Sequence, residues 1–122
     1  MTAPLGFRFS AVSAGIRKDG RIDLALAACD EPAVAAGVFT RNLVRAAPVE
    51  VAARRVAAGV ARAVLVNAGC ANACTGAPGE EATLASTGAV AQALGVDAGM
   101  VLPASTGVIG ALLPADKIAS QA

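Results

Sequence analysis

The sequence predicts a mixed α/β fold, in which helices pack on a sheet with both parallel and antiparallel strands. Near the N-terminus, two apolar runs flank a charged turn, which predicts an antiparallel hairpin. Further along, two segments of helical composition alternate with two short apolar runs, an order typical of helices covering a sheet. The chain has 122 residues, a length that suits one domain or part of one.

The N-terminal third is expected to form three strands. Phe7 to Ile16 and Ile22 to Ala28 are rich in alternating apolar and β-branched residues, and Lys18-Asp19-Gly20 supplies the turn between them. We interpret Arg17 to Gly20 as a solvated hairpin tip. Val34 to Arg41 has the composition of a third strand.

Helices and strands are expected to alternate in the rest of the chain. Proline suits the first turn of a helix and glycine the position after its last turn, so Pro48 and Gly59 bound the first helix. A short apolar run between turn residues indicates a buried strand. The expected elements are a helix over Pro48 to Ala58, a strand over Ala61 to Asn67, a helix over Glu80 to Leu94, a strand over Met100 to Ala104, and a helix that begins at Pro114.

The apolar residues of this chain are mostly small. Alanine occurs 32 times, Val, Leu, Ile and Phe together 31 times, and Trp and Tyr are absent. Because each buried methylene contributes only about 0.8 kcal/mol, an alanine-rich core depends on close backbone packing against many neighbours. We therefore expect this chain to pack against more protein.

Composition excludes several function classes. A net charge of +1 and 2% aromatic residues argue against nucleic-acid binding, which needs a clustered basic face and stacking platforms. No apolar run reaches the roughly 18 residues of a membrane helix, and no targeting segment is visible. Cys29, Cys70 and Cys74 are odd in number and lack a zinc-type spacing, so we expect a cytoplasmic protein without a metal.

Two glycine-containing loops follow the predicted buried strands. Asn67 to Gly76 is either a loop that approaches a ligand or a tight loop whose Asn side chains satisfy backbone groups. Ala104 to Gly110 places the Thr106 hydroxyl beside the Gly107 N–H. Such a pair either forms a Ser/Thr-Gly turn or converges on one oxygen atom as an oxyanion hole.

Several segments, taken in order, resemble the ornithine acetyltransferases of arginine biosynthesis, also called glutamate N-acetyltransferases. Each segment alone is weakly informative, whereas their order and spacing together are highly specific. The segments are Ala14 to Arg17, Asp23 to Leu26, Ala35 to Thr40, Ala46 to Val49, Asn67 to Gly76, Ala104 to Gly110, and Leu113-Pro114.

The resemblance implies a part of an N-terminal-nucleophile-type α/β fold and an acetyl-transfer activity. Members of this family are precursors that cut themselves before an internal threonine, giving α and β chains that stay associated as a hetero-oligomer. The freed threonine takes acetyl from N-acetylornithine, and in some members from acetyl-CoA, and passes it to glutamate. No cofactor or metal is needed. Thr106 and Gly107 match the pair whose hydroxyl and backbone N–H stabilise the oxyanion.

Two departures from the family pattern affect these expectations. Position 70 is Cys, where the family more usually has Asn, and the chain stops at Ala122, before the self-cleavage threonine. We therefore expect residues 1–122 to be the N-terminal part of the α chain, inactive without the missing C-terminal part and the β chain. The alternatives are a non-catalytic binding or interaction module on the same scaffold, and a family member with another substrate.

Overall fold

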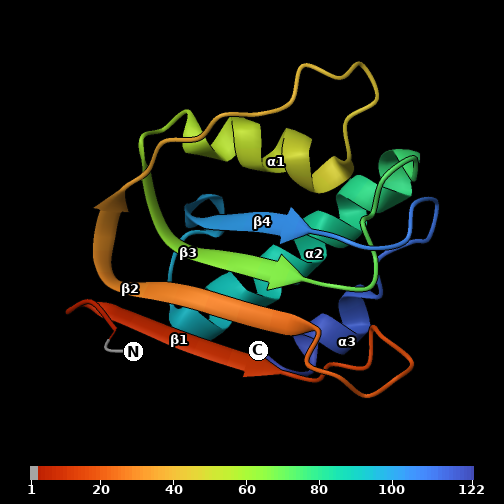
Figure 1. The fold of residues 1–122 in the computed structure, drawn as a ribbon. Helices are drawn as coiled ribbons and strands as arrows, with labels where there is room; N and C mark the ends of the chain where they lie inside the picture. Colours follow the sequence, from red (N-terminus) through yellow and green to blue (C-terminus); the bar gives the residue numbers. More distant parts are fainter. Residues whose placement is uncertain (1–2) are drawn as a thin grey trace.

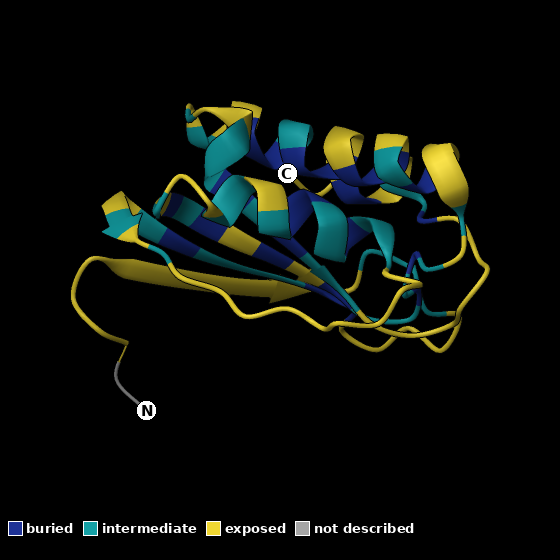
Figure 2. Cartoon of the chain, turned by 90° about the horizontal axis from the view of Figure 1, so that it is seen from above, coloured by how far each residue is buried: buried dark blue, intermediate teal, exposed yellow. Residues whose placement is uncertain are grey.

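The computed structural model describes residues 3–122 and has the α/β architecture that the sequence predicts. Four strands form one sheet, and the α-helices gather on one side of it (Figures 1 and 2). The elements are β1 (Phe7–Val12), β2 (Leu24–Val34), α1 (Ala47–Val56), β3 (Val60–Asn67), α2 (Gly76–Leu94), a 3-10 turn η1 (Ala98–Met100), β4 (Val101–Ser105) and α3 (Ala115–Ala119).

The sheet has the order β1-β2-β3-β4 and mixes two kinds of pairing. β1 and β3 both pair with β2 in the antiparallel sense, whereas β3 and β4 are parallel and are connected through α2. Parallel neighbours end at the same edge of a sheet. The two loops singled out by the sequence therefore leave the sheet side by side.

Strand β1 is shorter than predicted because a buried carboxylate captures the chain beyond it. β1 ends at Val12 rather than at Ile16. The next turn contains Ala14 and Arg17, whose N–H groups each donate to the Asp23 carboxylate at 2.7 Å. These N–H groups are therefore not available for a strand ladder, and the hairpin has a long loop in place of a tight turn.

The predicted strand over Val34 to Arg41 is wrong. β2 extends to Val34, its register against β3 shifts between Ala28 and Ala33, and its pairing ends at Val34 opposite Val60. The Ala35 N–H still donates to the Gly59 carbonyl, at 2.9 Å. Residues 36 to 41 then run without regular structure, since no other strand of residues 3–122 lies beside them.

Both long helices form where the sequence predicts helices, although α2 begins earlier than expected. In α1, Pro48 lies in the first turn and is buried with Val51. The start of α2 at Gly76 instead of Glu80 follows from the loop before it. There the buried Asn72 side chain donates to the Gly79 carbonyl at 2.7 Å, which fixes the first helical turn. Gly95 ends α2 in the left-handed conformation, as a glycine C-cap does.

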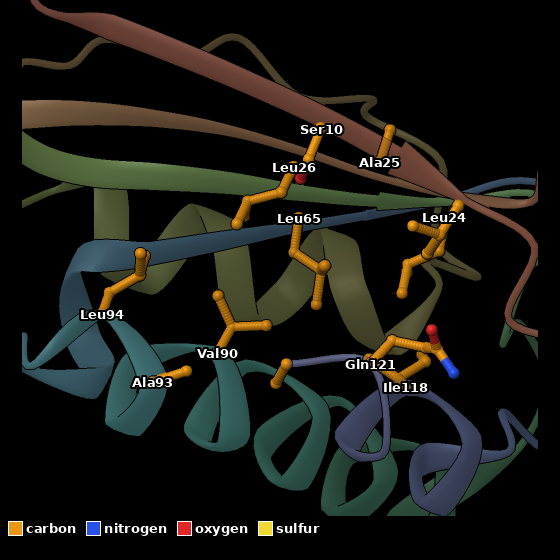
Figure 3. Close-up of a pocket in the computed structure, with 12 residues that line it drawn as sticks. Ser10, Leu24, Ala25, Leu26, Leu65, Val90, Ala93, Leu94, Ile118 and Gln121 are labelled. Carbon is orange, nitrogen blue, oxygen red and sulfur yellow. The ribbon is translucent and has the colours of Figure 1, made fainter.

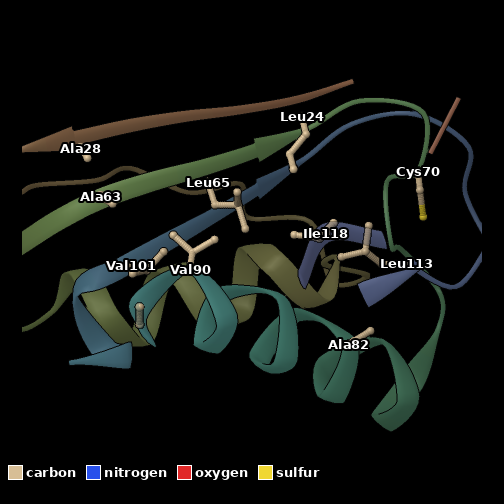
Figure 4. Close-up of a cluster of buried hydrophobic side chains, with 11 residues drawn as sticks. Leu24, Ala28, Ala63, Leu65, Cys70, Ala82, Val90, Val101, Leu113 and Ile118 are labelled. Carbon is tan, nitrogen blue, oxygen red and sulfur yellow. The ribbon is translucent and has the colours of Figure 1, made fainter. Parts of the chain in front are cut away.

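The core lies between the sheet and the helices, and alanines make it thin. Ala63 of β3 and Ala91 of α2 are almost fully buried, as is Ile118 of α3, at 1% exposure. α3 is the helix expected from Pro114. Figure 4 shows the cluster, which consists of Leu24, Ala28, Ala63, Leu65, Cys70, Ala82, Val90, Ala91, Val101, Leu113 and Ile118.

The helices do not fill the space beneath β1 and β2. An apolar cavity of about 150 Å³ remains between these strands and α2, with Leu26, Val90 and Ile118 among its lining residues (Figure 3). Within residues 3–122, none of the helices combines the length and the hydropathy that a bilayer crossing requires.

Candidate active site

The two loops that follow β3 and β4 are joined by backbone hydrogen bonds. The Thr106 N–H donates to the Asn67 carbonyl at 3.0 Å, and the Val108 N–H donates to the Gly69 carbonyl at 3.3 Å. In return, the Ala71 N–H donates to the Val108 carbonyl at 2.9 Å. These bonds continue the parallel β3–β4 pairing into the loops and hold the segment around Thr106 in one position.

Gly107 lies in direct backbone contact with the other loop. Its φ of +134° is a conformation that L side chains rarely adopt. A Cβ atom added to Gly107 would lie 2.3 Å from the carbonyl carbon of Gly69 and 2.5 Å from the nitrogen of Cys70. Only glycine allows this approach, so the residue type at position 107 determines how closely the two loops pack.

Both predicted oxyanion donors lie on one open groove. The groove has a volume of about 940 Å³. Thr106 and Gly107 are exposed, and the hydrogen bonds among residues 3–122 leave the Gly107 N–H and the Thr106 hydroxyl without an acceptor. The lining residues are Ile16, Arg17, Lys18, Asp19, Ala68, Gly69, Cys70, Thr106, Gly107, Val108, Ala111, Leu112 and Pro114.

Asp23 holds the turn that forms the opposite wall of this groove, a role that the sequence pattern did not predict. Its side chain is 2% exposed and holds the 14–17 turn, while its carbonyl accepts the Ala68 N–H at 2.8 Å. Burial raises the pKa of the Asp23 carboxyl, but the N–H groups of Arg17, Ala14 and Ile16 together outweigh that effect and lower the pKa below its usual value. An acidic residue at the start of a buried strand was the available signal.

Because the Asp23 carboxylate holds the 14–17 turn in place, the interpretation of Arg17 changes. Lys18, Asp19 and Gly20 are exposed, as a hairpin tip should be, whereas Arg17 is half-buried. A Cβ on Gly69 would lie 2.8 Å from the Cγ of Arg17. Gly69 is therefore enclosed between the Arg17 side chain on one side and Gly107 on the other, and the solvated-tip interpretation is wrong for Arg17.

Replacing Asp23 by asparagine is expected to destabilise the fold by about 2 kcal/mol at pH 7, because hydrogen bonds to a charged group contribute roughly 1.5–3 kcal/mol each. A carboxyl with a lowered folded pKa stabilises above its unfolded pKa, near 3.9, and this contribution is lost as the pH falls through the folded pKa. Urea unfolding of both proteins at pH 7 and pH 3 measures the difference. If the difference in unfolding free energy between the two proteins is the same at both pH values, the Asp23 carboxylate does not stabilise the fold through its charge.

The Asn side chains of the first loop satisfy backbone groups, as the tight-loop interpretation proposed. The Asn67 amide donates to the Cys70 carbonyl at 2.8 Å. The fully buried Asn72 accepts a hydrogen bond from the Thr75 hydroxyl at 2.9 Å and donates to Thr83 at 2.9 Å. These two amides therefore stabilise the loop itself.

The cysteines lie in different environments and are not paired. Cys70 is buried, and its thiol donates to the Ala111 carbonyl at 3.2 Å, which ties the two loops together in the wall of the groove. Cys74 is exposed, and Cys29 is partly buried. In the described part of the chain, no three His, Cys, Asp or Glu residues gather as metal ligands do.

A family model for the ArgJ family matches residues 8–122. The chain belongs to the ArgJ family. Among curated ArgJ relatives, the arginine biosynthesis bifunctional protein ArgJ of Nitratidesulfovibrio vulgaris is 56% identical over 116 residues, which cover 94% of this chain and 30% of that protein. The protein of the same name from Geobacter sulfurreducens is 52% identical over 113 residues, or 93% of this chain and 29% of its own length.

Two solved ArgJ structures have the same fold. The ornithine acetyltransferase of Mycobacterium tuberculosis, crystallised with ornithine, is 48% identical with a TM-score of 0.93, and the match covers 97% of this chain and 64% of that one. The Bacillus halodurans protein ArgJ is 36% identical with a TM-score of 0.91, and the match covers 96% and 61%. The predicted α/β class, as part of an N-terminal-nucleophile-type domain, is confirmed, and this chain spans about 30% of the length of its curated ArgJ relatives.

Proposed function

We propose that this chain supplies the oxyanion-stabilising part of a glutamate N-acetyltransferase site of arginine biosynthesis. The observation that carries the proposal is the pair of free donors, the Thr106 hydroxyl and the Gly107 N–H, on one open groove. Relatives about 50% identical carry the name arginine biosynthesis bifunctional protein. In this proposal the chain is the N-terminal part of the α chain and acts in the cytoplasm.

The proposed chemistry needs a threonine nucleophile from another part of the protein. Its hydroxyl oxygen attacks the acetyl carbonyl of N-acetylornithine, and the carbonyl oxygen becomes an oxyanion that accepts hydrogen bonds from Thr106 and Gly107. The threonine's own amino group takes the hydroxyl proton and passes it to the nitrogen as the C–N bond breaks, so ornithine leaves and acetyl stays on the threonine. The amino group of glutamate then attacks the acyl-threonine, and a second oxyanion forms in the same place. The ester C–O bond breaks, the proton lost by the glutamate amine returns to the threonine oxygen, and N-acetylglutamate is released.

The fold favours this role because it fixes the two donors before substrate arrives. The Thr106 N–H is bonded to Asn67, and Gly107 is packed on the backbone of Gly69. Donors that need no rearrangement during the reaction stabilise developing charge most effectively. Ornithine as the leaving group is supported by the M. tuberculosis relative, whose structure was solved with ornithine.

A non-catalytic binding module is the second candidate. It is favoured by one observation, that within residues 3–122 the groove-lining residues include Thr106 but no second Ser or Thr that would act as the nucleophile. A groove that offers donors but no second Ser or Thr is able to hold a small anion without forming an acyl-enzyme ester. The two candidates differ in whether the chain supports turnover once the rest of an ArgJ protein is supplied.

A chimera tests the proposal. This chain replaces the matching segment of the N. vulgaris relative, and acetyl transfer from N-acetylornithine to glutamate is measured for the chimera, the unmodified relative and the 122-residue chain alone. We expect the chimera to turn over and the chain alone to be inactive, because the covalent route needs the absent nucleophile. A folded, self-cleaved chimera without activity favours the binding module, and activity of the chain alone contradicts the need for an outside nucleophile.

A further inference from the structure

The segment that carries Thr106 and Gly107 is bonded at alternate residues to the loop that follows β3. The N–H groups of Thr106 and Val108 donate to the carbonyls of Asn67 and Gly69. Neighbouring residues in a ladder of this kind direct their N–H groups to opposite edges. The Gly107 N–H lies between the two bonded N–H groups, so it faces away from that loop, and the described residues give it no acceptor.

Gly107 rests on one peptide group of the same loop, the peptide between Gly69 and Cys70. A Cβ added to Gly107 would lie 2.3 Å from the Gly69 carbonyl carbon and 2.5 Å from the Cys70 nitrogen. Groups packed this closely move together, because a protein interior has few voids that absorb a shift. A displacement of the Gly69–Cys70 peptide therefore displaces Gly107 and changes the direction of its N–H.

The Asn67 side chain holds the residue at the end of this peptide. Asn67 is 3% exposed, and its Nδ2 donates to the Cys70 carbonyl at 2.8 Å. Its main-chain carbonyl accepts the Thr106 N–H at 3.0 Å. One buried residue is therefore connected to both predicted donors, to Thr106 through its main chain and to Gly107 through Cys70.

We propose that Asn67 is a positioning residue for the oxyanion hole, because its hydrogen bond to the Cys70 carbonyl fixes the peptide on which Gly107 rests. The Gly107 N–H is thereby directed at the oxyanion. The inference rests on the proposed acetyl transfer and adds a residue that acts through the loop, since Asn67 is not among the residues that line the groove. A misdirected donor weakens binding of the transition state and not of the substrate, so kcat should respond and KM should not.

Asn67→Asp in the chimera tests this role. Aspartate has the shape of asparagine, but its carboxylate has no N–H to donate and would face the Cys70 carbonyl oxygen, so the Gly69–Cys70 peptide has to move. We expect kcat per folded, self-cleaved chimera to fall at least about tenfold, a part of the 10²- to 10³-fold effect of losing a hole donor. KM for N-acetylornithine and for glutamate should change little.

Asn72→Asp is the matched control. Asn72 is a buried amide of the same loop, but its Nδ2 donates to Gly79 and Thr83 of α2 and not to the residues beside Gly107. This variant should lower the melting temperature and leave the kcat of the folded chimera unchanged. If Asn67→Asp does not fold, Asn67→Ala and Asn72→Ala are compared instead, since alanine removes the donor without burying a charge.

The position 67 variant should lose kcat at constant KM while the position 72 variant loses only stability. Equal kcat in the two variants overturns the inference, as does a loss at position 67 that lies in KM alone. Thr106→Ala separates this result from the proposed function. If Thr106→Ala lowers kcat and the position 67 variant does not, the positioning role alone is wrong. If neither variant lowers kcat, the oxyanion hole itself is wrong.

Discussion

Thr106→Ala in the chimera is expected to lower kcat about 10²- to 10³-fold, the usual effect of removing one oxyanion-hole donor. The Thr106 hydroxyl has no other hydrogen-bond partner among the described residues, so its deletion removes a donor without releasing a buried group. KM is expected to change little, because the oxyanion exists in the transition state and not in bound substrate. Steady-state rates with N-acetylornithine and glutamate measure both quantities.

Two further variants separate the Thr106 hydroxyl from general effects on the loop. Thr106→Ser keeps a hydroxyl and should retain most activity. Ser105→Ala removes the neighbouring hydroxyl, which lies outside the residues that line the groove, and should leave kcat unchanged. If Thr106→Ala keeps the kcat and the melting temperature of the unmodified chimera, the assignment of Thr106 is wrong.

Gly107→Ala is expected to affect both stability and catalysis. The new methyl group would lie 2.3 Å from the carbonyl carbon of Gly69, so the two loops must separate. Overpacking and a disfavoured φ each cost about 1–3 kcal/mol. We therefore expect a loss of at least about 2 kcal/mol in unfolding free energy, together with a lower kcat, because the 107 N–H moves from its position on the groove.

Gly110→Ala is the matched control for Gly107. Gly110 also has a positive φ, +83°, but nothing lies within 4 Å of an added Cβ. Alanine at position 110 therefore carries the conformational cost without the backbone collision. Thermal unfolding and kcat of the two variants are compared in the chimera. If both variants lose the same stability and the same activity, the contact between Gly107 and Gly69 does not matter.

The elements that could be predicted from the sequence are those whose signals are local. Pro48, the apolar run before Asn67 and Gly95 mark α1, β3 and the end of α2, because proline, short apolar runs and glycine act through their own backbone preferences. Thr106 and Gly107 stood out as a hydroxyl and a glycine after a strand, but it was the resemblance to the ornithine acetyltransferases that favoured an oxyanion hole over a Ser/Thr-Gly turn. Their placement on an open groove agrees with that prediction, and their catalytic role stays a prediction.

Other features depend on residues distant in the sequence. Val34 to Arg41 has strand composition, yet a strand needs a partner, and β3 begins only at Val60, which pairs with Val34. Asp23 shortens β1 only because the 14–17 turn folds back onto its carboxylate. The early start of α2 likewise depends on Asn72, whose amide reaches the carbonyl of Gly79.

By itself, then, the sequence determined the α/β class, the helices, the strands β3 and β4 and the two loops with candidate donors. Only the tertiary structure decided that Gly107 packs on Gly69, that Arg17 forms a wall of the groove, and that the α-helices gather on one side of the sheet. The physical reason is that local backbone preferences are encoded residue by residue. Close approach, burial of a charge and strand pairing are properties of two segments at once, and they exist only when both segments are in place.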